Sequence, residues 1–237
     1  QKVKSKGEVL KYTFNKLKSN DEIDAYVIFD ADNVVHREFL NKMNDSINCG
    51  YEVVQGFRDT KNICDNWLST SYAILYYLQS LFINKSRFNF GMSSFLNGTG
   101  FMVKKETIDR YGYDPKTITE DIEYTAICAI NGIKIAFNEN AITYDEQVTD
   151  FKSSLKQRKR WSFGAIQCLK NYTGSLIKEG IKNKRFECFD VIIFYFGIIF
   201  HVLFTIVSLI GIFYNVFYLN DFNSMDVVFF FFFFFFN

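Results

Sequence analysis

Two pairs of carboxylates stand out in the sequence because their spacing could concentrate negative charge at one point. Asp30 and Asp32 follow the apolar run YVIF, and Glu120 and Asp121 precede a stretch of helical character. Side chains two positions apart on a strand point to the same side. Asp30 and Asp32 could therefore share one hard cation such as Mg²⁺ or Mn²⁺, which prefers oxygen ligands. The alternative for this pair is a solvated loop.

The second pair allows two interpretations. Acids near the start of a helix stabilise it through capping and through the helix dipole, with Thr119 or Glu120 close to the N-cap. A carboxylate in a partly desolvated cleft can instead act as a general base, because its pKa rises toward neutrality. The spacing of Glu120 and Asp121 by itself favours the capping interpretation.

A third segment, QRKRW at residues 157–161, combines positive charge with an aromatic ring. Gln157, Arg160 and Trp161 fall at i, i+3 and i+4, so they share one side of a helix. A guanidinium can bind a diphosphate, and an indole can stack on a sugar ring. The alternative is a basic interfacial helix that touches lipid headgroups.

An alternation of apolar runs and helical patterns surrounds these segments and predicts an α/β domain with a mostly parallel sheet, ending near residue 175. Ligands tend to bind at the carboxyl ends of such strands, where Asp30 and Asp32 would lie. Gly132 is expected to end the helix that begins at Asp121. The expected strands fall within residues 24–32, 51–57, 95–103 and 134–137, and the expected helices within 36–48, 67–83, 105–110, 121–131 and 151–172.

The C-terminal part has a different character. Residues 191–219 contain no Asp, Glu, Lys or Arg over 29 positions, and about 20 apolar residues suffice to cross a membrane. We expect a domain at 1–175, a basic juxtamembrane linker at 176–188, a transmembrane segment at 189–219 and a loop with a poly-Phe tail at 220–237. Basic residues before the apolar run favour a cytosolic domain. The alternative is a buried helix of a soluble protein.

Composition excludes several classes of protein. The 27 Lys and Arg residues nearly balance the 26 Asp and Glu residues, so no overall field favours nucleic acid as a partner. The five cysteines are scattered without C-x-x-C spacing, which argues against a disulfide framework or a zinc site and fits a reducing cytosolic setting.

Taken in order, DAD, TED and QRKRW resemble the motifs of membrane-bound, processive-type glycosyltransferases of family 2, which include cellulose, chitin, hyaluronan and poly-N-acetylglucosamine synthases. The resemblance implies a GT-A fold and inverting, metal-dependent sugar transfer. It implies that Asp30 and Asp32 hold the metal and the nucleotide sugar, that Asp121 is the catalytic base and that Glu120 supports it. Gln157, Arg160 and Trp161 would serve the acceptor channel and the nucleotide pocket.

Two weaker matches extend the resemblance. Lys6 and Gly7 resemble a family segment that touches the nucleotide, and Gly98 and Thr99, within NGTG, resemble a loop that lines the acceptor end. Each could also be a simple turn.

The implied donor is a UDP-sugar, with UDP-N-acetylglucosamine and UDP-glucose as first choices. The implied acceptor is a saccharide or a lipid-linked molecule at the plasma membrane. We expect a piece of a longer protein, because the family domain normally starts with a strand and an acid that reads uracil, and no such unit precedes Lys6. The alternatives are a non-catalytic glycosyltransferase-like membrane subunit and a metal-dependent hydrolase of nucleotide sugars, which would leave Trp161 unexplained.

Overall fold

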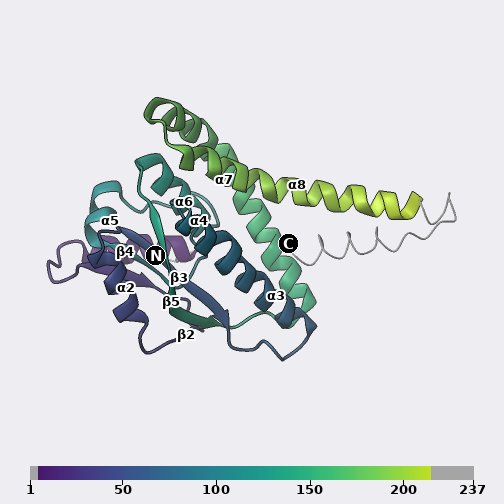
Figure 1. The fold of residues 1–237 in the computed structure, drawn as a ribbon, viewed down its shortest axis with the longest axis horizontal. Coiled ribbons are helices and arrows are strands. Elements are labelled where there is room, and N and C mark those ends of the chain that lie inside the picture. Colours follow the sequence, from purple (N-terminus) through teal and green to yellow (C-terminus); the bar gives the residue numbers. More distant parts are fainter. Residues whose placement is uncertain (1–4, 215–237) are drawn as a thin grey trace.

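A mixed five-stranded sheet forms the centre of the molecule (Figure 1). The computed structural model describes residues 5–214, apart from the side chains of residues 198, 199, 201, 202 and 205. The strands are arranged in the order β1-β4-β3-β5-β2. Their bounds are Ala25–Ile28 for β1, Val34–Val35 for β2, Val53–Thr60 for β3, Phe101–Lys104 for β4 and Ile135–Asp145 for β5.

The predicted, mostly parallel sheet is wrong. Among the described strands β3 and β5 pair in parallel, whereas β4 runs antiparallel to both β1 and β3, and β2 runs antiparallel to β5. The first three residues of β4, Phe101 to Val103, are all buried. Such a continuous apolar run is typical of an interior strand of either direction, so its composition did not reveal that β4 runs against its neighbours.

Helices lie on both sides of the sheet. The described helices are α1 Lys6–Leu17, α2 Phe39–Asn48, α3 Trp67–Leu78, the π-helix η1 Gln79–Lys85, α4 Ser86–Asn89, α5 Lys105–Tyr111, α6 Glu120–Asn131, α7 Phe151–Asn183 and α8 Phe186–Tyr214. Alternate strand residues face opposite sides. Val53 accordingly packs in the cluster that contains α1 and α6, whereas Val54 packs in the cluster that contains α2.

Local signals explain where α6 begins and ends. Its first turn carries Glu120, Asp121 and Glu123, which the helix dipole favours at this end. The helix ends at Gly132, whose φ of +72° lies in the left-handed region that glycine adopts without strain. The predicted helix and its glycine C-cap are thus confirmed. Thr119 occupies the N-cap position without a side-chain capping hydrogen bond.

The segment expected to be a juxtamembrane linker is helical. Helix α7 continues without a break to Asn183, and Lys184 ends it in a left-handed conformation with φ of +52° before α8 begins at Phe186. The second half of α7 packs against the beginning of α8, and α8 then projects away from the domain (Figure 1). Leu176, which we assigned to the linker, is completely buried in their shared core.

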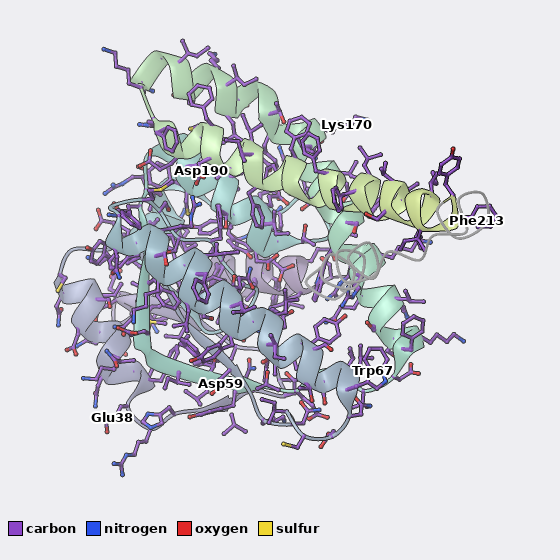
Figure 2. The ribbon with its side chains drawn as sticks, turned by 45° about the vertical axis from the view of Figure 1, so that its right-hand side comes forward. Glu38, Asp59, Trp67, Lys170, Asp190 and Phe213 are labelled. Carbon is purple, nitrogen blue, oxygen red and sulfur yellow. The ribbon has the colours of Figure 1, made fainter. Side chains whose placement is uncertain are left out.

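The predicted transmembrane segment at 189–219 is not confirmed. No helix in residues 5–214 combines the length and the apolar character that a membrane crossing requires. The first turns of α8 belong to the folded domain instead, because Asp190 forms an ion pair with Arg87 and Tyr195 packs in a core cluster with α6 and α7. Asp190 lies against the body of the domain and Phe213 at the projecting end of α8 (Figure 2). Residues 215–219 and the tail at 220–237 lie outside the described residues.

Candidate active site

A cleft of about 570 Å³ brings together residues from distant parts of the chain. Eight of the predicted site residues line it: Lys6, Asp30, Asp32, Gly98, Glu120, Asp121, Gln157 and Arg160. The other lining residues are Ser5, Arg58, Asn97, Ile118 and Thr119. The three predicted others, Gly7, Thr99 and Trp161, are not among the residues that line the cleft.

Lys6 connects three segments of the cleft. It lies in the first turn of α1, where the Ser5 side chain accepts a hydrogen bond from Glu8 N–H. Its ammonium Nζ lies 2.5 Å from Asp30 Oδ1 and also donates to the carbonyl of Gly98 at 2.5 Å. The carboxylate of Glu120 lies 3.8 Å from the same nitrogen. One cation therefore joins the DAD, NGTG and TED segments.

Gly7 contributes through packing. A Cβ at this position would lie 2.6 Å from Pro115 Cγ and 3.3 Å from Glu120 Cβ. A side chain cannot be placed at such distances without moving its neighbours. Glycine at position 7 therefore lets the start of α1 approach the loop before α6, and this approach brings Lys6 to the cleft.

Asp30 and Asp32 lie directly after β1. The backbone N–H of Asp30 donates to Asn33 Oδ1 at 2.7 Å and to Thr99 Oγ1 at 3.1 Å. Thr99 is completely buried and also donates to Asn33, so its hydroxyl supports the turn that carries Asp30. Asp32 is exposed at the cleft, and its carbonyl accepts a hydrogen bond from Lys61.

The donor set at this turn fits a hard cation that takes most of its ligands from elsewhere. Within the described part of the chain, no group of three or more His, Cys, Asp or Glu side chains could hold a metal ion. Mg²⁺ in nucleotide sites usually binds one or two carboxylates and completes its shell with phosphate oxygens and water. The exposed carboxylate of Asp32 meets this requirement, whereas Lys6 already occupies Oδ1 of Asp30.

Burial changes the acid strength of both carboxylates of the TED segment. It raises the pKa of Asp121 above its ordinary value, although the backbone N–H of Ile122 and the charge of Lys6 partly oppose the shift. Burial and the neighbouring charge of Asp121 likewise raise the pKa of Glu120. A raised pKa makes a carboxylate a better proton acceptor. The geometry therefore allows Asp121 to act as a base as well as to begin α6.

Gly98 brings the backbone close to this base. Its φ of +80° lies in the left-handed region, and a Cβ at this position would lie 3.1 Å from Asp121 Oδ2. Any other residue would meet both backbone strain and the carboxylate. The NGTG turn and Asp121 thus form adjacent walls of the cleft.

Arg58 is a cleft residue that the sequence analysis missed. Its guanidinium donates to Asp145 Oδ2 at 2.7 Å and to the carbonyl of Asn97 at 3.0 Å. It also lies 3.6 Å above the ring of Tyr76, a cation–π contact. The strand predicted from the sequence, at residues 51–57, stops one residue before Arg58. Strand β3 in fact continues to Thr60, and an arginine inside a buried strand was the available signal.

Glu123 is a second missed residue, and it holds the loop before α6. Its completely buried carboxylate accepts hydrogen bonds from the backbone N–H of Lys116 at 2.8 Å and of Thr117 at 2.7 Å. The hydroxyl of Tyr172, on α7, donates to the same carboxylate. Glu123 therefore fixes the loop that leads into Asp121 and ties it to α7.

Helix α7 is seated directly against the TED loop. A Cβ on Gly164 would lie 2.8 Å from Thr119 Cβ and closer still to Thr119 Oγ1 and Cγ2. The side chain of Gln167 accepts a hydrogen bond from Ile118 N–H at 3.1 Å. These contacts place Arg160 and Gln157, about one and two turns before Gly164, at the cleft.

Trp161 contacts α3 and is not among the residues that line the cleft. Its ring packs edge-on against Tyr72 and Tyr76 of α3, with ring centroids 6.1 and 6.4 Å apart. The indole is half-buried in this aromatic cluster. In this structure Trp161 therefore anchors α7 to α3, whereas Gln157 and Arg160 face the cleft.

The sequence is similar to proteins of one known family. The family model described as Glycosyltransferase like family 2 matches residues 1–164. The probable glycosyltransferase YdaM of Bacillus subtilis (strain 168) is 25% identical over 199 residues, which cover 74% of this chain and 44% of that protein. The chain thus spans less than half the length of this relative. Because the family match includes every motif in the cleft, the chain belongs to glycosyltransferase-like family 2.

Proposed function

We propose that this protein is an inverting, metal-dependent glycosyltransferase with a GT-A fold, which transfers a sugar from a UDP-sugar to a saccharide or lipid-linked acceptor. The observation that carries the proposal is the convergence of DAD, TED and QRKRW with Lys6 in one cleft. The cleft contains a carboxylate with a raised pKa, Asp121, beside three cations. A base next to a site for a diphosphate leaving group is the arrangement that sugar transfer requires.

In the proposed reaction the acceptor hydroxyl attacks the anomeric carbon of the donor in line with the bond to the diphosphate. Asp121 takes the hydroxyl proton as the new C–O bond forms. The bond between the anomeric carbon and the diphosphate oxygen breaks, and its electron pair leaves with the nucleoside diphosphate. Glu123 and Gly164 keep Asp121 in place by fixing the loop and helix around it.

The diphosphate would lie near Lys6, Arg58 and Arg160, whose charges favour negative charge that develops on the leaving group. Asp32, with Asp30 beside it, would hold Mg²⁺ or Mn²⁺. Such an ion, when bound, neutralises phosphate charge as a Lewis acid. Glu120 would support the site through its contact with Lys6.

We further propose UDP-N-acetylglucosamine or UDP-glucose as donor and a membrane as the setting. The membrane proposal is supported by α8, whose projecting half exposes large apolar side chains such as Phe200, Ile210 and Phe213. Clusters of exposed apolar side chains mark surfaces that bind proteins or lipids.

Calorimetric titration with UDP tests the binding part of the proposal. We expect UDP to bind in the presence of Mn²⁺ and to bind at least about tenfold more weakly with a chelator or in Asp32→Asn. Asp121→Asn serves as the matched carboxylate control and should bind UDP with nearly unchanged affinity. Equal binding with and without the metal ion would contradict metal dependence.

A further inference from the structure

Arg58 is a cation in the wall of the cleft, and its side chain is only 12% exposed. Its Nε and Nη2 donate to the Asp145 carboxylate, and its Nη1 donates to the carbonyl of Asn97 at 3.0 Å. A guanidinium has five N–H groups, so one on each terminal nitrogen has no partner among the described residues. Such charged N–H groups bind phosphate oxygens strongly, and Arg58 therefore has donors left for a ligand of the cleft.

The ring of Tyr76 fixes the one direction that these hydrogen bonds leave loose. The donors of a guanidinium lie in its plane, so the bonds to Asp145 and Asn97 hold its edges and resist a tilt of the plane only weakly. Tyr76 lies against the face instead, with Arg58 Cζ 3.6 Å from the ring centroid. Burial raises the pKa of Tyr76 to about 12, so the ring is neutral and offers the negative face of its quadrupole to the cation.

Neighbours on α3 and α7 hold Tyr76 in turn. The residue is 5% exposed and is not among those that line the cleft. Its ring stacks on Tyr72 and meets Trp161 edge-on, with both ring centroids 6.4 Å away. The Tyr72 hydroxyl lies 2.8 Å from Ser154 Oγ and accepts from Arg158 Nε at 3.2 Å. The ring is thus fixed by α7, the helix that carries the QRKRW segment.

We propose that Tyr76 is a positioning residue for the leaving group: with Trp161 packed behind it, it holds the guanidinium of Arg58 at the angle at which its unpaired N–H groups meet the diphosphate. Tyr76 acts through Arg58 and does not itself contact the substrate. Trp161, the aromatic end of QRKRW, then serves the nucleotide end of the cleft. This inference rests on the proposed function, which puts the diphosphate near Arg58.

The test changes the charge on the ring face and leaves the shape of the ring nearly unchanged. Tyr76→Phe keeps the ring and removes only the hydroxyl. A trifluorinated phenylalanine at position 76 then withdraws electrons from the ring face, which weakens a cation–π contact, and Tyr76→Leu removes the ring. Tyr77 receives the same replacements as the matched control, because it is the next residue of α3 but is half-exposed and packs against Phe57.

Calorimetric titration with UDP and Mn²⁺ measures the effect, and thermal unfolding reports the stability of each variant. We expect Tyr76→Phe to bind UDP as the wild type does, the fluorinated residue to bind it more weakly and Tyr76→Leu to bind it most weakly. A cation–π contact limits the loss to roughly two- to thirtyfold. In a transfer assay with chitotetraose and cellotetraose, kcat should fall in the same order while the acceptor KM stays unchanged. The variants at position 77 should bind UDP as the wild type does.

A second background separates positioning from a merely structural role. An ammonium has no plane to tilt, so in Arg58→Lys the fluorinated residue at position 76 should leave UDP affinity unchanged. A structural role of Tyr76 would instead give the same loss with either cation at position 58.

Each failure has its own signature. If UDP affinity did not depend on fluorination at position 76, or depended on it equally in Arg58→Lys, the role of Tyr76 would be refuted while the proposed function stood. If Tyr76→Phe already lost the affinity, the hydroxyl and not the ring face would be responsible, and the inference would be wrong. If the wild type did not bind UDP, the proposed function itself would fail.

Discussion

The close packing of α7 against Thr119 of the TED loop leads to a prediction with an internal control. Gly164 and Gly174 both lie inside α7. A Cβ on Gly164 would lie 2.8 Å from Thr119 Cβ, whereas a Cβ on Gly174 would have no atom within 4 Å. Replacing each glycine with alanine therefore makes the same chemical change in the same helix, in contact with the loop in one case and in open space in the other.

The expected magnitudes follow from two opposing effects. Alanine in a helix interior is favoured over glycine by about 1 kcal/mol, and both variants gain this amount. Gly164→Ala also forces a methyl group into Thr119, and overpacking of this kind costs about 1–3 kcal/mol. Gly174→Ala should thus be stabilised by about 1 kcal/mol, and Gly164→Ala should be less stable than Gly174→Ala by about 1–3 kcal/mol.

Chemical denaturation of both variants measures this difference, and a transfer assay measures its consequence. A displacement of about 1 Å can cost roughly a hundredfold in rate, so Gly164→Ala should lose turnover by roughly ten- to hundredfold while Gly174→Ala keeps the wild-type rate. If Gly164→Ala were as stable and as active as Gly174→Ala, α7 would not be seated on the TED loop, and the placement of Gln157 and Arg160 would lose its support.

Three further predictions concern the residues around the base. Tyr172→Phe removes the hydroxyl that donates to the buried Glu123 carboxylate, so denaturation should show a loss of about 1.5–3 kcal/mol; unchanged stability would mean that this bond does not form. Because the pKa of Asp121 is raised in the folded protein, kcat should fall on the acid side at a pH above the ordinary carboxylate range, and a profile flat down to pH about 4 would contradict this. The same shift means that the ionised carboxylate disfavours folding, so Asp121→Asn should be more stable than the wild type at neutral pH. That advantage should shrink as the pH falls through the folded-state pKa and protonates the wild-type residue, and an advantage independent of pH would argue against a raised pKa.

Much of the helical structure was predictable because its signals are local. The acids at the start of α6 and Gly132 at its end stand within a few residues of the boundaries that they define. The start of α7 at Phe151 was likewise visible, although its continuation to Asn183 was not. The direction of β4 depends on how the chain returns after a turn, and its apolar residues carry no record of that path.

The composition of the cleft was predictable only in part. The motif residues were found because their types and spacing point to chemistry, but Arg58 and Glu123 acquire their roles from distant partners. Arg58 pairs with Asp145, 87 positions away, and Glu123 accepts from Tyr172, 49 positions away. Trp161 shows the converse. Its helical spacing predicted that Trp161 would share a side of the helix with Arg160. In the structure its ring packs against Tyr72 and Tyr76 of α3.

We propose sugar transfer in this cleft with Asp121 as the base, and the roles of the surrounding residues depend on it. The most direct measurement follows radiolabelled sugar from UDP-N-acetylglucosamine and UDP-glucose into lipid-bound or oligosaccharide product, in membranes with Mg²⁺ or Mn²⁺. We expect transfer from one donor by the wild type and a loss of roughly 10²–10⁴-fold in Asp121→Asn, with UDP affinity retained. Transfer at the wild-type rate by Asp121→Asn, or UDP binding without any transfer by the wild type, would contradict it.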